Sequence, residues 1–234
     1  MSSPLRYRRA VVKLSGELLG GEAGPLNATE LAFFARAIRD VRTAGAEVAV
    51  VVGGGNIARG SALPQLPPVA GHTVGMLATL INVVALREAL DAAGVPARLF
   101  SALPCPGVAE PVDPWQARVA LAAGQVVLWG AGTGNPFVTT DTAAVIRALS
   151  VSADAVVKAS KVDGVYEDDP EARPGARPLG RISHHDYLCA GLEVMDQAAV
   201  AIAGKHGLPI VVFRGDRAGG LLAALRGELG SLIG

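Results

Sequence analysis

Residues 125–144 read QVVLWGAGTGNPFVTTDTAA, and this strand–loop–helix pattern is the key to the expected fold class. The segment Gln125 to Trp129 is mostly apolar and predicts a buried strand, while Thr139 to Leu149 has the apolar spacing of a helix. Between them lies a loop of glycines, hydroxyls and an amide, which is poorly suited to a hydrophobic core. The loop is therefore either a surface connection or the wall of a site for a polar ligand.

Strand-like and helix-like segments alternate along the rest of the chain. Predicted strands lie at residues 10–14, 47–52, 97–100, 125–129, 153–158 and 208–213, and predicted helices at 28–43, 74–93, 115–123, 139–149 and 221–225. Asn27 is expected to cap the first helix. Segment 47–52 is almost entirely Val and Ala, as is typical of a strand covered on both faces. The alternation predicts an α/β fold, an αβα sandwich with a mainly parallel central sheet.

The composition excludes several classes of partner. Of 234 residues, 50% are hydrophobic, and Lys plus Arg equals Asp plus Glu at 21 each, so the chain lacks the basic excess typical of nucleic-acid or anionic-membrane binding. Cys105 and Cys189 lie far apart and are expected to be reduced thiols. We see no signal-peptide pattern and no apolar run approaching the roughly 20 residues that span a bilayer. We expect a cytoplasmic protein with a small-molecule partner, no nucleic acid and no membrane.

Three glycine-rich turns follow predicted strands, at residues 15–16, 53–56 and 132–135. Open α/β sheets bind their ligands at the carboxyl ends of the strands, and glycine lets backbone amides approach phosphate oxygens. Any one of these turns could simply need a positive φ. Together with Lys13 on the first strand and Arg59 after the second turn, they indicate a phosphate site. The GxxxxGK[ST] and GxGxxG motifs are absent, which argues against a P-loop enzyme or a standard dinucleotide binder.

Each charged candidate also has a plainer explanation. Lys13 could reach solvent from the end of its strand, and Arg59 could be an ordinary loop residue. Asp141 could be a first-turn acid favoured by the helix dipole. The run His184-His185-Asp186 lacks a further ligand at metal spacing, so no protein metal site is predicted.

Five ordered blocks carry a resemblance to a known family. They are KLSGE at 13–17, VGGGNIARG at 52–60, GMLAT at 75–79, GTGNPFVTTD at 132–141 and KASKVDGVY at 158–166. In order and spacing they resemble the bacterial uridylate kinases (UMP kinases) of the amino-acid kinase superfamily. The resemblance covers nearly the whole chain and implies a single amino-acid kinase domain over residues 1–234. It also implies an ATP-dependent nucleoside monophosphate kinase that uses Mg²⁺ with ATP and converts UMP to UDP in pyrimidine nucleotide biosynthesis.

The resemblance also assigns site residues. Lys13 and Asp141 match catalytic positions, at which the lysine neutralises the transferring phosphoryl group and the aspartate orients the lysine. The positions that match ATP contacts are Lys13, Leu14, Ser15, Gly16, Gly55, Arg59, Ser160, Tyr166 and Asp169. The positions that match UMP contacts are Gly54, His72, Thr133, Gly134, Asn135, Pro136, Phe137, Val138, Thr139 and Thr140. A side-chain base is not required, because phosphoryl transfer depends mainly on positioning and charge neutralisation.

The chain departs from the family pattern in several places. His72 stands where the family usually carries an Asp that helps to hold the UMP ribose, and a neutral imidazole accepts one hydrogen bond but not two. Arg214 follows Phe213 where the family usually has Asn. The resemblance also suggests GTP or UTP as effectors that regulate the activity. Arg98 stands at an expected effector contact, while Gln125 replaces an arginine of some members.

Two alternatives to a UMP kinase stay open at this point. One is a superfamily kinase whose acceptor has changed, and the other is a regulator that binds UMP and ATP but catalyses little. The resemblance further implies a homohexamer built through helices such as residues 74–93.

Overall fold

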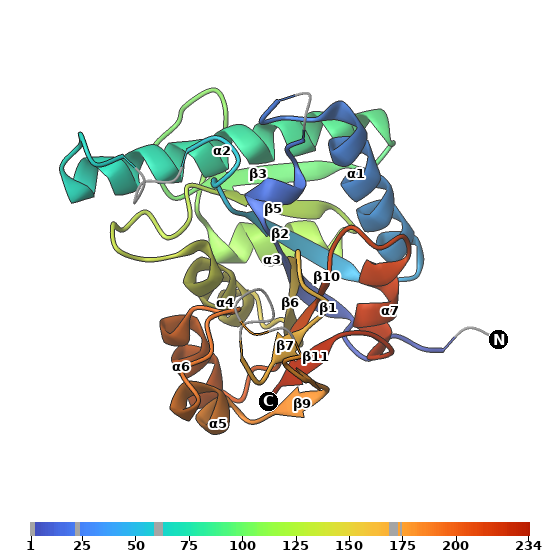
Figure 1. Cartoon of the computed structure of the whole chain (residues 1–234). Helices are drawn as coiled ribbons and strands as arrows, with labels where there is room; N and C mark the ends of the chain where they lie inside the picture. Colours follow the sequence, from blue (N-terminus) through green and yellow to red (C-terminus); the bar gives the residue numbers. More distant parts are fainter. Residues whose placement is uncertain (1–2, 22–23, 59–62, 169–172, 174) are drawn as a thin grey trace.

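The centre of the molecule is a nine-stranded sheet with the strand order β4-β3-β5-β2-β1-β6-β10-β11-β9 (Figure 1). This computed structural model describes residues 3–21, 24–58, 63–168, 173 and 175–234. The strands are β1 (Arg9–Leu14), β2 (Glu47–Val52), β3 (Ala97–Ser101), β4 (Glu110–Pro111), β5 (Val126–Gly130), β6 (Ala155–Ser160), β9 (Arg181–Ile182), β10 (Ile210–Arg214) and β11 (Ser231–Ile233). Among these described strands, all neighbours pair in parallel except β10 and β11. A separate antiparallel pair is formed by β7 (Val165–Tyr166) and β8 (Pro178–Leu179).

Helices cover both faces of this sheet, as Figure 1 shows. One face is covered by α1 (Ala28–Thr43), α2 (Pro68–Ala92) and α7 (Gly220–Arg226). The other is covered by α3 (Pro114–Ala122), α4 (Thr140–Ser150), α5 (His184–Cys189) and α6 (Gln197–Lys205). A short 3-10 turn, Gly16–Leu18, follows β1. The structure thus confirms the predicted α/β class, an αβα sandwich with a mainly parallel sheet.

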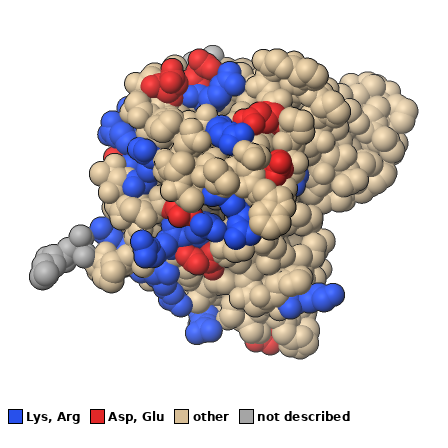
Figure 2. Space-filling model, turned by 180° about the vertical axis from the view of Figure 1, so that it is seen from behind, with Lys and Arg blue, Asp and Glu red and all other residues tan. Residues whose placement is uncertain are grey.

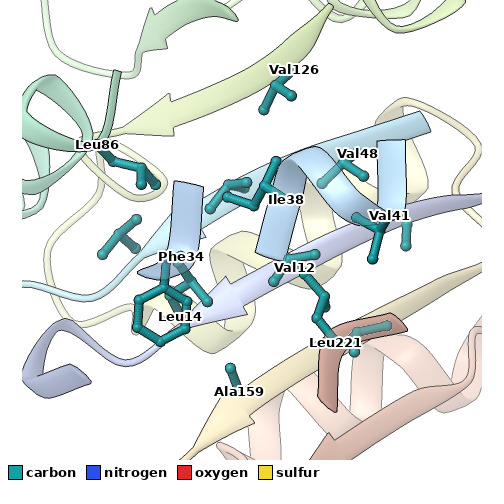
Figure 3. Packing of buried hydrophobic residues seen from close by; sticks show 14 of the residues in the cluster. Val12, Leu14, Phe34, Ile38, Val41, Val48, Leu86, Val126, Ala159 and Leu221 are labelled. Carbon is teal, nitrogen blue, oxygen red and sulfur yellow. The ribbon is translucent and has the colours of Figure 1, made fainter. Parts of the chain in front are cut away.

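Alternate residues of each central strand fill the two apolar layers. In Figure 3, Val12 and Leu14 of β1 point into the same cluster as Phe34 and Ile38 of α1. Because side chains alternate along a strand, the residues between them belong to the opposite face, where Val11 joins the second core cluster. Lys13 therefore lies on the side of the sheet that α4 covers.

The predicted elements appear close to their expected positions. Strand β2 has the predicted bounds, and the Asn27 side chain accepts a hydrogen bond from the Thr29 N–H at 2.9 Å, which confirms the helix cap. Helix α2 begins at Pro68 rather than at residue 74, because proline is well suited to the first turn of a helix. Strands β4, β9 and β11 were not predicted, since elements of two or three residues show no periodicity. The two cysteines are free, as expected.

Helix α2 corrects one expectation from the sequence. It is long and apolar enough, by length and composition, to cross a membrane, and it is the one such helix among the described residues. Its three charged residues, Arg87, Glu88 and Asp91, all lie near the C-terminal end, so the expectation that no segment would qualify was wrong. The helix packs on α1, β3 and β5 and contributes Val83, Leu86 and Leu90 to the core. These contacts are those of a core helix in a folded domain.

Candidate functional site

A cluster of three buried charged side chains lies at the carboxyl end of the sheet. Asp141 places Oδ1 2.9 Å from the Nζ of Lys13 and Oδ2 2.6 Å from the Nζ of Lys158. The exposed fractions of Lys13, Asp141 and Lys158 are only 8%, 7% and 7%. Lys158 also donates a hydrogen bond to the Val194 carbonyl at 2.5 Å. Two ammonium groups and one carboxylate leave this interior site with an excess of positive charge.

The local structure explains why these three groups meet. Lys13 of β1 and Lys158 of β6 are direct partners in the register of two parallel strands, so both side chains leave the sheet on the same face. Asp141 lies in the first turn of α4, whose cap is Thr139. The plainer explanation of Lys13 is excluded, because a side chain this buried does not reach into solvent. Asp141 does lie in the first turn of its helix, where the helix dipole favours an acid. It also forms ion pairs with two lysines, which the dipole alone does not explain.

The charges shift the protonation of the cluster. Burial alone would raise the pKa of Asp141, but the charges of Lys13 and Lys158 outweigh it and hold that pKa well below its usual range. Burial lowers the pKa of Lys158 to about 8, with the charge of Asp141 opposing this shift and that of Lys13 adding to it. The carboxylate is therefore ionised at neutral pH, and the centre favours an anionic ligand.

Close packing explains the glycines of the first two turns. A Cβ on Gly16 would collide with the Gly53 carbonyl oxygen, and a Cβ on Gly54 would lie 2.8 Å from the Gly75 carbonyl oxygen on α2. Neither Gly16 nor Gly54 has a positive φ, so a turn requirement does not account for them. In the third turn the backbone conformation requires glycine, because Gly132 and Gly134 have positive φ values of 57° and 81°. The first two turns need glycine for backbone approach, and the third needs it for conformation.

A cavity of about 640 Å³ opens beside the carboxyl end of β6. It is lined by Ser160 and Tyr166, both predicted ATP contacts, and by residues 190–194 before α6. Leu14 is buried in the core, so its side chain is not available to a ligand. Two further predicted ATP contacts, Arg59 and Asp169, lie outside the described residues.

A second cavity, of about 450 Å³, lies over the third glycine turn and the start of α2. The predicted UMP contacts that line it are Gly54, His72, Asn135, Phe137, Val138, Thr139 and Thr140. The predicted contacts Thr133, Gly134 and Pro136 belong to the same loop without lining the cavity, while Gly55, expected on the ATP side, does line it. The ring of His72 lies 4.7 Å from that of Phe137, centroid to centroid. Phe137 itself has a φ of 63°, a strained value for a bulky residue.

Two residues of the site were missed from the sequence. Lys158 could have been found, because it is a lone cation near the end of an apolar strand, as Lys13 is. Asp196 caps α6, and its N–H donates to Asp141 Oδ2 at 3.2 Å. Its own Oδ2 accepts hydrogen bonds from the hydroxyls of Thr139 at 2.6 Å and Thr142 at 2.8 Å. Asp196 thus joins the charged cluster to the wall of the second cavity, a role that no local sequence pattern indicates.

Comparisons with known proteins agree with this geometry. Residues 8–214 match the sequence model of the amino acid kinase family, and the chain belongs to that family. The uridylate kinase of Azorhizobium caulinodans is 48% identical over 227 residues, which cover 96% of this chain and 95% of the relative. The uridylate kinase of Legionella pneumophila (strain Paris) is 44% identical over 234 residues, covering 98% and 95%. The crystal structure of UMP kinase from Bacillus anthracis matches with a TM-score of 0.93 at 35% identity, covering 97% of this chain and 96% of that one.

The paired carboxylate makes a prediction about pH and stability. Asp141→Asn should lower the free energy of unfolding at pH 7 by about 3 kcal/mol, because two buried ammonium groups lose their counter-charge. The folded-state pKa of Asp141 lies below the ordinary value of 3.8, so its contribution is present above that value and is lost as the pH falls toward the folded-state pKa. In urea unfolding from pH 7 down to about pH 3, the difference in free energy of unfolding between the wild-type protein and Asp141→Asn should stay constant and should shrink only below about pH 4.

The matched control is Asp40→Asn, which removes an exposed carboxylate that lies 3.5 Å from Arg39. This variant should change the unfolding free energy by well under about 1 kcal/mol at every pH. If the two substitutions lowered the free energy of unfolding equally at pH 7, the ion pairs of Asp141 would not stabilise the fold more than an exposed ion pair does.

Proposed function

We propose that this protein is a UMP kinase, which transfers the γ-phosphoryl group of ATP to UMP and releases UDP and ADP. The observation that carries the proposal is the buried cationic centre of Lys13, Asp141 and Lys158, whose strand and helix lead directly to residues that line two cavities. Strand β6, which carries Lys158, ends at Ser160 in the first cavity. Asp141 directly follows Thr140, which lines the second. The full-length similarity to proteins named uridylate kinase supports ATP and UMP as the two occupants.

The arrangement suits the chemistry of phosphoryl transfer. The reaction brings two anions together in line, and catalysis consists mainly of holding them there and offsetting their charge. In this proposal Lys13 neutralises the transferring phosphoryl group while Asp141 fixes the position of its ammonium. The glycine turns offer backbone amides to the phosphates, and the second cavity holds the acceptor.

Mg²⁺ belongs to this proposal as the partner of ATP. Bound with ATP, it would supply positive charge that offsets the charge developing on the phosphates. The described residues contain no group of three or more His, Cys, Asp and Glu that could hold a metal. Asp141 has both oxygens engaged by lysines, so the donor set fits an ion that is held by the phosphates rather than by a protein cage.

We also propose small-molecule partners and a cytoplasmic location. Figure 2 shows basic and acidic side chains side by side on one face of the molecule, in keeping with the balanced charge of the chain. A nucleic-acid surface would instead show an extended basic stripe. We propose no nucleic-acid and no membrane partner.

GTP and UTP are effectors in this proposal. Arg98, the expected effector contact, lines a cavity of about 360 Å³ that also includes Arg87. Its guanidinium forms a two-pronged pair with Glu110, with Nε at 2.9 Å and Nη2 at 2.5 Å. An anionic effector that used Arg98 would therefore compete with Glu110.

The first test is replacement of the central lysine. With ATP, Mg²⁺ and UMP, the protein should release ADP in a UMP-dependent reaction, and Lys13→Ala should lower kcat by about 100-fold or more, because it removes a charge that stabilises the transition state. Lys205→Ala, at an exposed site near the end of α6, is the control and should keep full activity. UMP binding without any ADP release by the wild-type protein would refute the kinase and favour a nucleotide-binding regulator.

A changed acceptor is the second candidate, and the position of His72 in the second cavity favours it. A carboxylate at this position could accept hydrogen bonds from two sugar hydroxyls, whereas a neutral imidazole accepts one. His72→Asp should raise the ratio of kcat/KM for UMP to that for dUMP by about tenfold, the effect of one hydrogen bond to a charged group. His206→Asp, at an exposed position, is the control. If dUMP or CMP is the better substrate of the wild-type protein, the acceptor has changed.

We also propose a homohexamer with α2 in an interface between subunits. Leu77 and Ile81, one turn apart on α2, are 47% and 48% exposed. On the face that Figure 2 shows, no charged side chain of a described residue is visible on the part of the molecule at the right into which α2 projects. Ile81→Glu should convert the assembly to smaller species in sedimentation velocity, because it places a charge in an apolar contact. Lys205→Glu, on the exposed side of α6, should leave the sedimentation pattern unchanged, and a monomeric wild-type protein would refute the hexamer.

A further inference from the structure

Arg147 of α4 is a buried cation that the proposed reaction does not explain. It is 8% exposed, and no ion pair within the described parts of the chain includes it. Its guanidinium carbon lies 5.1 Å from the centre of the Trp129 ring. Its Nη2 donates a hydrogen bond to the Gly132 carbonyl oxygen at 3.1 Å, while its buried Nε has no partner among the described residues.

Such a side chain is costly for the fold. Removing a guanidinium from water without a carboxylate beside it costs free energy, and a buried N–H without an acceptor adds to that cost. Burial lowers the pKa of Arg147, but arginine stays protonated in proteins. An apolar side chain of similar length would pack against Trp129 without these costs. The arginine therefore needs a reason other than stability.

The hydrogen bond to Gly132 provides that reason, because Gly132 lines the second cavity. The loop leaves β5 through Ala131 and Gly132, whose φ values of 59° and 57° are both in the left-handed region. At the start of this loop, the Thr79 hydroxyl of α2 accepts a hydrogen bond from the Ala131 N–H at 2.8 Å. Arg147 holds the Gly132–Thr133 peptide unit, two units further along, from the opposite helix layer.

The direction of this bond determines what the loop offers to a ligand. In a trans peptide the C=O and the N–H point in opposite directions. Since the Gly132 carbonyl points to Arg147, the N–H of Thr133 points away from the guanidinium. In the part of the chain that the structure describes, this N–H has no acceptor. The Gly134 N–H closes the turn by donating to the Ala131 carbonyl oxygen at 3.0 Å, but among the described residues only the bond from Arg147 holds the Gly132–Thr133 peptide unit itself.

We propose that Arg147 is a positioning residue for the acceptor nucleotide: it fixes the Gly132–Thr133 peptide, whose Gly132 lines the second cavity, in the orientation that turns the Thr133 N–H away from the guanidinium and leaves it available to the acceptor. This inference rests on the proposed UMP kinase function and adds the group that holds the acceptor loop in its binding conformation. ATP binds at the other cavity, so its binding should not depend on Arg147.

The test compares KM values for the two substrates. Arg147→Met should raise the KM for UMP by about tenfold or more, while the KM for ATP changes by less than about twofold. The melting temperature should stay the same or rise, since the variant removes an unpaired buried cation. Arg147→Lys, which keeps a cationic donor, should recover part of the UMP affinity. Arg118→Met is the control, because Arg118 lies 5.4 Å over the ring of Trp115 in the same kind of contact but is exposed.

A binding assay keeps the inference separate from the kinase proposal. The protein has two tryptophans, so in a Trp115→Phe background the fluorescence of Trp129, directly beneath Arg147, reports UMP binding without turnover. If the parent binds UMP but releases no ADP, the kinase proposal fails and the Kd for UMP alone decides the role of Arg147. An unchanged Kd in Arg147→Met, or KM values for ATP and UMP that rise together, would overturn the inference. Absence of UMP binding to the parent would overturn both proposals.

Discussion

Two lysines stand side by side on neighbouring parallel strands, and the carboxylate between them is the interaction on which the site depends. Like charges at paired positions of a sheet repel, so Lys13 and Lys158 require a counter-ion on the face they share. Asp141 supplies it from the first turn of α4, where the helix dipole also favours a negative charge. The pairing fixes α4 against β1 and β6, and the Asp196 amide extends the network to α6.

The strand order gives this centre its function. Strands β1 and β6 are adjacent in the middle of the sheet, with β2 and β5 on one side and β10 on the other. The loops after β2 and β5 line one cavity, and the loop after β6 lines the other. The positive charge of Lys13 and Lys158 therefore lies between the loops that line the two cavities, which is the place where an anion would have to pass from one ligand to another. The glycines of the first two turns bring the backbones close enough for this arrangement.

The sequence predicted most of the fold because long apolar strands such as β2 and capped helices such as α1 have strong local signals. It could not predict β4, β9 and β11, which depend on pairing partners far along the chain. The same limit applies to the site. Lys13 and Asp141 are recognisable from the motifs that contain them, but their contact with Lys158 depends on strand register. Asp196 acts through hydrogen bonds to Thr139, Asp141 and Thr142, and Arg147 through one to Gly132, and periodicity carries no information about such contacts.

The distribution of unbalanced charge argues for a binding site independently of any motif. A fold selected for stability alone would pair each buried cation or replace it with an apolar side chain. Here the cluster around Asp141 keeps an extra ammonium group, and Arg147 keeps an unpaired guanidinium behind the acceptor loop. Both lie near a cavity wall: Asp141 follows Thr140, and Arg147 donates to Gly132, and both Thr140 and Gly132 line the second cavity. Nucleotide phosphates would supply negative charge beside Lys13 and Lys158, while the cost of burying Arg147 is offset by the loop conformation that it holds for the acceptor.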